Sequence, residues 1–196
     1  MLFCCTKVSF RVTAWTSSHF SMILTFRFKP SRSILPRVKN NNTSYFYLLL
    51  LLGEPVTRRR VFLLAYVHSA PEHYVKRLLL RQTWANPLLY DRDIRLAFFV
   101  GRRSADSFVE QAVRLEATQF KDIIQADFED SYRNLTVKAM SALAWISRYC
   151  DRTRYVLKTD DDAFVNMRAL LRHLGKVNSR VHRDSKKSSS LFIIFE

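Results

Sequence analysis

Residues 154–166 read Arg-Tyr-Val-Leu-Lys-Thr-Asp-Asp-Asp-Ala-Phe-Val-Asn. The apolar run at 155–157 is bounded by polar residues and carries aromatic and β-branched side chains, which predicts a buried strand. Asp160, Asp161 and Asp162 follow it, and three adjacent carboxylates at the edge of a core repel one another and resist desolvation. A divalent cation such as Mg²⁺ or Mn²⁺ relieves both effects, because it binds carboxylate oxygens and keeps positions open for phosphate. The alternative is a solvated acidic turn between two apolar strands.

Apolar segments of strand length alternate with helical patterns on both sides of this stretch. Strands are predicted at 61–67, 94–100 and 122–127, and helices at 72–84, from 104 or 106 to about 120, at 134–149 and at 167–174. Nearly continuous apolar strands separated by helices predict an α/β fold with a parallel sheet that is covered on both faces. Ligands of such sheets bind at the carboxyl ends of the strands. Because the aspartates follow their strand, this placement favours a metal and nucleotide site over an acidic turn.

Helical spacing also predicts which side chains face the core. On the three longer helices they are Val75, Leu78, Leu79 and Thr83, then Val109, Val113 and Leu115 to Ala117, and then Leu135, Ala139, Ala142, Leu143 and Ile146. Ser104 or Asp106 is the expected cap of the second helix. Cys150 is expected to be a small buried hydrophobe or half of a disulfide.

The net charge of +15 is concentrated in the flanks of the 196-residue chain. Residues 1–60 hold 10 Lys/Arg against one Glu, and residues 176–196 hold 5 against 2 Asp/Glu, whereas residues 61–175 hold 17 against 14. A nearly balanced core with basic flanks fits an anionic membrane face or solvated tails at least as well as a nucleic-acid arm. We therefore expect no nucleic-acid partner.

These shifts in composition predict three regions. They are a poorly defined basic region at 1–56, a domain at 57–176 and a basic polar tail at 177–196. Residues 45–52 form an apolar run that would be only about 12 Å long as a helix, against the roughly 30 Å of a bilayer core. We interpret this run as a possible degenerate membrane anchor.

Cysteine and glycine counts exclude several classes of site. The three cysteines give neither a disulfide framework nor a zinc pattern, because no second Cys or His pair lies at ligand spacing. With only three glycines, the chain can build neither a phosphate-binding P-loop nor a G-x-G-x-x-G turn. If the protein binds a nucleotide, a metal and basic side chains must hold the phosphates.

Four motifs in the predicted domain carry a family resemblance. They are Ser69-Ala-Pro71 with Arg77 and Arg81-Gln-Thr-Trp84, then Phe98-Phe-Val-Gly101, then the run from Asp122 to Lys138, and finally Lys158-Thr-Asp-Asp-Asp-Ala-Phe-Val-Asn166. Together they closely resemble the β1,3-galactosyltransferase family, which also holds β1,3-N-acetylglucosaminyltransferases. The resemblance covers roughly residues 61–175, and the last two motifs together are highly specific.

The resemblance implies a GT-A fold, a Rossmann-like and mostly parallel sheet flanked by helices, with Mn²⁺ and a UDP-sugar donor. It implies transfer of a hexose, with inversion and in a β1,3 linkage, to an acceptor glycan on a glycoprotein or glycolipid. It also implies a type II single-pass membrane enzyme with its catalytic domain in the Golgi lumen. The chemistry agrees with the aspartates, because a metal that bridges the diphosphate oxygens neutralises the charge of the leaving nucleotide.

The matched motifs assign candidate site residues. Asp162 matches the family's metal-ligating position. Asp160 and Asp161 match its neighbours at the nucleotide, where a ribose contact or a water-mediated contact is expected, and Asp160 is also a candidate metal ligand. Trp84 and Tyr132 are expected to pack in the core, not to stack on a sugar or base.

Basic side chains in the motifs are candidates for binding the donor phosphates. They are Arg77, Arg81 and Lys138. Arginine suits bidentate phosphate contact, and the alternative is that these are surface charges on helices. Asp127 and Asp130 are expected to shape the donor pocket, although capping of the following helix explains Asp130 equally well. Asn134-Leu-Thr136 reads as an N-glycosylation acceptor, but Asn134 is more simply expected to cap that helix.

The resemblance also predicts residues downstream of the aspartates. Members of the family carry there an acidic motif that supplies the general base and a His that completes the metal shell. Neither is found up to residue 196, and His173 and His182 lie too near the aspartates to be matched to that His. No catalytic residue is assigned, and we expect the C-terminally truncated, donor-binding part of such an enzyme. The alternative is a catalytically inactive fragment that retains only donor and metal binding.

Overall fold

The computed structural model describes residues 10–13, 22–26, 49–50, 60–103, 108–150, 152–184 and 191–195. Its strands are β1 (Phe10–Thr13), β2 (Met22–Phe26), β3 (Leu49–Leu50), β4 (Leu63–His68), β5 (Ile94–Arg102), β6 (Ile123–Glu129), β7 (Tyr155–Asp160) and β8 (Leu191–Phe195). Its helices are α1 (Tyr74–Gln82), α2 (Phe108–Phe120), α3 (Leu135–Tyr149) and α4 (Met167–Asp184), with the short 3₁₀ turns η2 (Pro87–Leu89) and η3 (Tyr132–Asn134). Every strand and helix predicted between residues 61 and 175 is present.

The strands form one sheet in the order β1-β2-β8-β7-β4-β5-β6-β3. Its centre is parallel, because β4 pairs with both β7 and β5, and β5 pairs with β6. Strand β8 continues the parallel pairing at β7, whereas the pairings of β1, β2 and β3 are antiparallel. This confirms the predicted α/β class and the mostly parallel, helix-flanked sheet of a GT-A fold.

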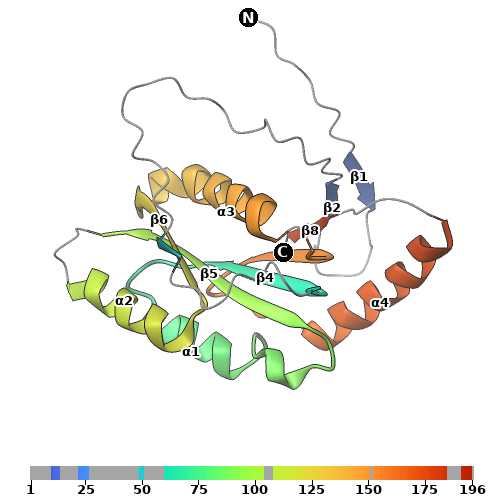
Figure 1. Ribbon diagram of the computed structural model, residues 1–196, viewed down its shortest axis with the longest axis horizontal. Helices are drawn as coiled ribbons and strands as arrows, with labels where there is room; N and C mark the ends of the chain where they lie inside the picture. Colours follow the sequence, from blue (N-terminus) through green and yellow to red (C-terminus); the bar gives the residue numbers. More distant parts are fainter. Residues whose placement is uncertain are drawn as a thin grey trace, which may run out of the picture.

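The helices cover the central strands from both sides (Figure 1). Helices α1, α2 and α4 lie against one face, and α3 lies against the other. Because successive side chains of a strand point to opposite faces, β4 contributes to both cores. Leu63, Ala65 and Val67 join the core beneath α1, α2 and α4, and Leu64 and Tyr66 join the core beneath α3.

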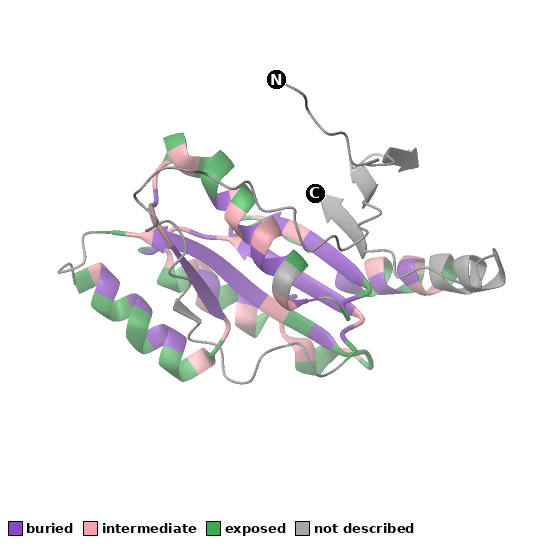
Figure 2. Ribbon diagram, turned by 45° about the horizontal axis from the view of Figure 1, so that its top comes forward, coloured by how far each residue is buried: buried purple, intermediate pink, exposed green. Residues whose placement is uncertain are grey.

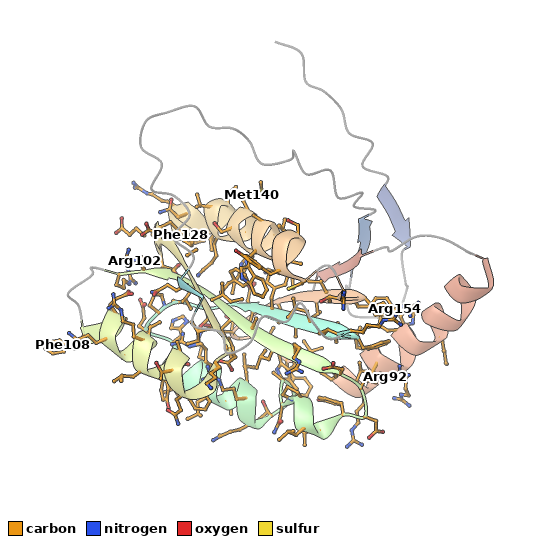
Figure 3. The ribbon with its side chains drawn as sticks, in the orientation of Figure 1. Arg92, Arg102, Phe108, Phe128, Met140 and Arg154 are labelled. Atoms are coloured by element: carbon orange, nitrogen blue, oxygen red, sulfur yellow. The ribbon has the colours of Figure 1, made fainter. Side chains whose placement is uncertain are left out.

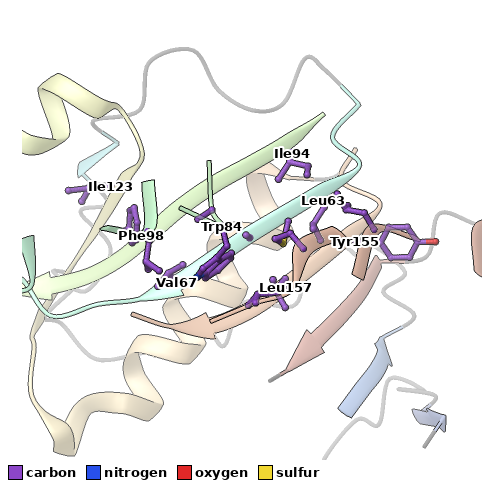
Figure 4. Packing of buried hydrophobic residues seen from close by; sticks show 14 of the residues in the cluster. Leu63, Val67, Trp84, Ile94, Phe98, Ile123, Tyr155 and Leu157 are labelled. Carbon is purple, nitrogen blue, oxygen red and sulfur yellow. The ribbon is translucent and has the colours of Figure 1, made fainter. Parts of the chain in front are cut away.

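Buried aliphatic and aromatic side chains hold these layers together. Figure 2 shows the central strands buried along most of their length, with the exposed residues on the outer sides of the helices. Figure 4 shows part of the larger core, where Trp84 lies among side chains of the central strands such as Val67 and Leu157. Each such side chain stabilises the fold by about 1.5–3 kcal/mol when fully buried.

The predicted inward face of α1 is wrong. Val75 and Leu79 point to solvent, with exposed fractions of 75% and 59%, and Thr83 is exposed as well. The buried side chains of this helix are Arg77 and Leu80. Helix α1 buries charged groups paired with α2 instead of an aliphatic stripe, and hydrophobic spacing does not detect such pairs.

The faces of α2 and α3 are predicted better. Within the stretch Leu115 to Ala117 that was expected to face the core, Leu115 is exposed, whereas Glu116 and Ala117 are buried. Leu135 at the start of α3 is exposed too. The side chains that are buried as predicted are Val113, Ala117, Ala142 and Ile146.

Two elements continue through glycines at which they were expected to end. Strand β5 passes Gly101 and ends at Arg102, and α4 passes Gly175 and ends at Asp184. A glycine inside a helix costs only about 1 kcal/mol, which packing of the rest of the helix offsets. The basic residues after Gly175 therefore begin within a helix.

Some predictions fall outside the described residues. The expected caps Ser104 and Asp106 lie there, as does the apolar run at 45–52 except for Leu49–Leu50. Among the helices that the structure describes, none has the length and apolar character needed to cross a membrane. Cys150 is buried in the core beneath α3, as expected of a small hydrophobe.

Candidate functional site

The aspartates lie at the edge of the sheet where β4 and β7 end side by side. Strand β7 ends at Asp160, and a hydrogen bond of 3.3 Å from Ala163 N to Asp160 O closes the turn that follows. In the parallel pairing of the two strands, Asp160 lies opposite His68, the last residue of β4. This is the predicted position, at the carboxyl ends of parallel strands.

The three aspartates do not point the same way. Asp160 and Asp162 are exposed, with 55% of the Asp160 side chain accessible, whereas only 7% of the Asp161 side chain is accessible. This follows from the alternation of successive side chains as the chain leaves a strand. Within the described parts of the chain, no hydrogen bond or ion pair reaches the carboxylate of Asp162. The two outer carboxylates therefore face solvent, and the middle one faces the protein.

Asp161 is held by three donors from one segment, the end of β4 and the start of α1. Ser69 Oγ donates to Asp161 Oδ2 at 2.7 Å, and Lys76 Nζ donates to Oδ1 at 3.2 Å. His73 Nδ1 lies 2.7 Å from Oδ2 and must be the donor, because a carboxylate only accepts. Burial alone would raise the pKa of the Asp161 carboxyl, but these hydrogen bonds outweigh it and hold that pKa below its usual value.

Asp160 has a cation and an imidazole beside it. Lys158 Nζ donates to Asp160 Oδ1 at 2.7 Å, and His68 Nδ1 lies 4.0 Å from the same oxygen. The His68 side chain is only 9% accessible, and its Nε2 has no hydrogen-bond partner within the described ranges. Burial, reinforced by the charges of Lys158 and Lys138, lowers the pKa of His68 to about 4. His68 is therefore a neutral imidazole near pH 7.

Arg77 is fully buried, and the protein uses all five of its N–H donors. Nε and Nη2 donate to the two carboxylate oxygens of Glu116 at 2.9 and 2.7 Å. Nη2 also donates to Pro71 O at 2.9 Å, and Nη1 donates to Ala70 O at 2.5 Å and to Ser69 Oγ at 2.9 Å. The alternative of a surface charge is therefore wrong. The predicted contact with a donor phosphate has no support from this geometry, because no N–H of Arg77 is left for it.

Arg81 is held in the same network. Its Nη1 donates to Glu116 Oε1 at 2.7 Å, and its Nε and Nη2 donate to the two carboxylate oxygens of Asp122 at 2.8 and 2.7 Å. The guanidinium also lies over the rings of Phe98 and Phe120, at 4.8 and 4.0 Å from their centroids. A bidentate, stacked arginine of this kind ties elements together. Its predicted role at the donor has no support here either.

Lys138 and Asp130 form a second buried connection. Lys138 Nζ donates to Ser69 O at 2.9 Å and to the two carboxylate oxygens of Asp130 at 2.9 and 2.8 Å. Asp130 Oδ2 also accepts a hydrogen bond of 2.7 Å from Gly101 N. Asp130 therefore does not cap α3, and Lys138 is not a surface charge. Both link α3 to the ends of β4 and β5.

The remaining candidates are more peripheral. Asp127 accepts a hydrogen bond of 2.8 Å from Arg102 Nη1 at the end of β5. Asn134 precedes α3 without capping it, because its side-chain amide donates to Glu129 O at 2.8 Å. Tyr132 is 89% exposed, so its expected packing in the core is wrong.

Several residues of this site were not singled out from the sequence. They are His68, His73 and Lys76. The position of His68 at the end of a predicted strand was a signal for it, since that strand ends at the same edge as the aspartates. Trp84 is buried as predicted, but its Nε1 also donates to Ala163 O at 3.1 Å, next to the aspartates.

The outer carboxylates suit a hard divalent ion of the kind that nucleotide sites use. Such an ion takes one or two carboxylates from the protein and completes its shell with phosphate oxygens and water. Asp160 and Asp162 can supply two, whereas the oxygens of Asp161 are already engaged by three donors. Among the residues that the structure describes, no group of three or more His, Cys, Asp or Glu is arranged to hold a metal by itself.

Comparison with known proteins finds a family model and individual relatives that match this chain. The family model described as Galactosyltransferase matches residues 75–192. Beta-1,3-galactosyltransferase 4 of Mus musculus is 40% identical over 115 residues, which cover 58% of this chain and 30% of the relative. Beta-1,3-galactosyltransferase 5 of Mus musculus is 40% identical over 119 residues, covering 60% and 38%. Lactosylceramide 1,3-N-acetyl-beta-D-glucosaminyltransferase A of Xenopus laevis is 29% identical over 181 residues, covering 83% and 48%. The chain thus spans between 30% and 48% of the length of these relatives.

Proposed function

Because this chain belongs to the galactosyltransferase family, we propose that it transfers a hexose from a UDP-sugar to an acceptor glycan hydroxyl in a β1,3 linkage. The names of these three relatives share a 1,3 linkage and differ in the sugar, which is galactose in two and N-acetylglucosamine in the third. The proposed acceptor is a glycan on a glycoprotein or a glycolipid. A Golgi-lumenal location with a membrane anchor belongs to the same proposal and rests on the family resemblance alone.

The observation that carries the proposal is the orientation of the aspartates. Asp160 and Asp162 face solvent at the carboxyl edge of the sheet, and Asp161 faces inward. An acidic turn without a function would gain by exposing all three carboxylates, because burying one costs desolvation. Here Ser69, His73 and Lys76 fix the middle carboxylate. The two outer carboxylates, of which Asp160 is paired with Lys158, face solvent at a position typical of ligand binding in α/β sheets.

In this proposal Asp162 and Asp160 hold a divalent cation, for which Mn²⁺ is the family's ion. When bound, the cation neutralises the charge that develops on the leaving UDP. Lys158 limits the repulsion between the carboxylates through its ion pair with Asp160. Asp161 contributes by orientation, since its own oxygens are taken by Ser69 and its neighbours. The described residues thus supply the donor side of the reaction.

Calorimetry on the full chain tests donor binding. We expect UDP to bind in Mn²⁺ and to lose most of its affinity in EDTA or with Asp162→Asn. Asp91→Asn is the matched control, because Asp91 is an exposed carboxylate in the loop before β5. Equal binding with and without Mn²⁺, or by Asp162→Asn and wild type, would contradict the proposed metal site.

Transfer is tested separately with UDP-galactose and UDP-N-acetylglucosamine as donors. Acceptors that end in galactose or N-acetylhexosamine cover the sugars suggested by the family, and NMR of the product gives the linkage. A 1,3-linked product would support the proposal. Metal-dependent UDP binding without transfer or donor hydrolysis would instead support the alternative of a fragment that binds the donor but does not catalyse.

A further inference from the structure

We propose that Ser69, Arg77 and Trp84 are positioning residues that hold the turn at 161–163 from both sides, so that the Asp162 carboxylate is fixed before metal and donor bind. This inference rests on the proposed function, because that function gives the Asp162 carboxylate a metal to bind. None of the three residues touches the metal or the donor in this arrangement. Each acts through the backbone or side chain next to Asp162.

Ser69 is the point at which four connections meet. Its backbone N donates to Phe99 O at 3.1 Å, and its backbone O accepts from Lys138 Nζ at 2.9 Å. Its hydroxyl accepts from Arg77 Nη1 at 2.9 Å and donates to Asp161 Oδ2 at 2.7 Å. A hydroxyl has a single hydrogen, and the shorter distance favours Asp161 Oδ2 at 2.7 Å as its acceptor over Ala70 O at 3.4 Å. Ser69 is only 2% exposed, so water does not compete for these bonds.

Arg77 sets the orientation of that hydroxyl from beneath. Its guanidinium is planar, keeps its charge and is fixed by Glu116 on one side and by Ala70 O and Pro71 O on the other. The Nη1 that reaches Ser69 therefore cannot rotate independently. This explains why a cation is buried beneath the metal site without contacting it.

Trp84 holds the other side of the turn. Its indole Nε1 donates to Ala163 O at 3.1 Å, and its ring is buried in the core beneath α1. Ser69 directly follows β4 and Trp84 follows α1, so the segments on either side of α1 anchor the two neighbours of Asp162. Asp162 itself has no protein partner among the described residues. Its carboxylate is thus free to take a ligand, while its backbone is held. A ligand group preorganised in this way binds its metal without first having to be ordered.

Two measurements on the full chain test the inference with Ser69→Ala and Trp84→Phe. Trp84→Phe keeps a large ring in the core and removes only the N–H. Hydrogen exchange reports on the anchoring of residues 160–163, and calorimetry reports on Mn²⁺-dependent UDP affinity. We expect faster exchange in that segment, with α2 and α3 unchanged, and about a tenfold loss of affinity for each variant. Ser147→Ala is the control, because its hydroxyl bonds only Ala144 O on the exposed side of α3.

A double-mutant cycle separates positioning from general destabilisation. If Ser69 acts through Asp161, then Ser69→Ala should cost little further affinity in an Asp161→Asn background. Full additivity, wild-type affinity in both single variants, or weaker binding with unchanged exchange in the turn would each overturn the inference. If the wild-type chain binds no UDP in Mn²⁺, the proposed function fails. The exchange of residues 160–163 in Ser69→Ala and Trp84→Phe still decides whether the turn is anchored as inferred.

Discussion

Ser69 Oγ donates a hydrogen bond of 2.7 Å to Asp161 Oδ2, and this bond joins two residues that are 92 positions apart in the chain. It connects the end of β4 to the end of β7, strands that already pair in parallel through the core. The geometry of the aspartates therefore depends on the buried network behind Ser69 as well as on the turn itself. Substitutions in this buried network should therefore change the geometry of the solvent-exposed carboxylates, although they lie far from them.

Removing Arg77 should destabilise the fold strongly. Arg77→Met leaves the oxygens of Ser69, Ala70 and Pro71 without their buried donor. It also breaks the buried ion pair between Arg77 and Glu116, and breaking a buried ion pair costs about 3–5 kcal/mol. We expect a loss near the lower end of that range, because Arg81 continues to pair with Glu116. Urea unfolding of the full chain measures the free energy of unfolding.

The control for Arg77→Met is Arg95→Met on β5. Arg95 Nε lies 3.2 Å from Asp93 Oδ1, and the two side chains are 45% and 37% exposed. Loss of such a surface ion pair should change the free energy of unfolding by less than about 0.5 kcal/mol. Equal stabilities of the two variants would show that the buried guanidinium is dispensable.

The contrast between these arginines shows where sequence reasoning succeeds. The strands were predictable because runs such as Tyr155 to Leu157 are apolar throughout and are buried on both faces. The burial of Arg77 was not, because its partner Glu116 lies on another helix and neither residue belongs to an apolar pattern. Hydrophobic spacing assigned α1 the wrong face for that reason.

Some features of the candidate site could likewise be predicted from the sequence, and others could not. That the aspartates lie at the carboxyl edge of a parallel sheet followed from their position directly after a strand in a chain of alternating strands and helices. The inward direction of Asp161 follows from side-chain alternation, but its partners Ser69, His73 and Lys76 come from a distant segment. The position of Lys138 in the third motif indicated importance, and only the fold shows that its ammonium is used internally.

Gly101 should not tolerate a side chain. A Cβ there would lie 2.8 Å from Asp130 Cβ and 2.9 Å from both Phe128 Cε2 and Phe128 O, and the backbone oxygen cannot move away cheaply. Phe128 lies at the same end of the sheet as Arg102, the residue after this glycine (Figure 3). We expect Gly101→Ala to lower the free energy of unfolding by about 1–3 kcal/mol, measured by urea unfolding.

Gly175→Ala is the matched comparison. Among the described residues, a Cβ at Gly175 would meet the end of the Arg92 side chain, at 3.3 Å, and the glycine lies within α4. Alanine should therefore stabilise the helix by up to about 1 kcal/mol. The prediction for Gly101 is wrong if the two alanine variants change stability in the same direction.

His68 should make the fold sensitive to acid. The unfolded chain binds a proton at this imidazole near its ordinary pKa of 6.5, whereas burial lowers the folded-state pKa to about 4. The stabilising effect of the neutral form is complete above pH 6.5. It is lost as pH falls towards 4, because only the unfolded state gains a proton in that window. The loss should reach about 3 kcal/mol.

Urea unfolding of wild type and His68→Gln between pH 3.5 and 8 isolates this effect. Carboxylates that titrate near pH 4 contribute to both proteins, so the difference between the two curves reports on His68. We expect the wild type to lose stability faster than the variant between pH 6.5 and 4. Parallel curves would mean that the imidazole titrates in the folded state as it does in the unfolded chain.

The two neighbouring aspartates should give opposite results when each is changed to asparagine. Asp162 has no partner among the described residues, so Asp162→Asn should leave the free energy of unfolding in EDTA within about 0.5 kcal/mol of wild type. Asp161 accepts from Ser69, His73 and Lys76, and Asp161→Asn weakens these charge-assisted bonds. We expect Asp161→Asn to cost about 1–3 kcal/mol without metal or donor present.

With Mn²⁺ added, only proteins that keep Asp162 should gain stability, because a ligand that binds the folded state shifts unfolding by mass action. Asp161→Asn should therefore be less stable but still respond to Mn²⁺, whereas Asp162→Asn should be stable and unresponsive. A stable Asp161→Asn, or an Asp162→Asn protein that Mn²⁺ still stabilises, would reverse the roles assigned to the two residues.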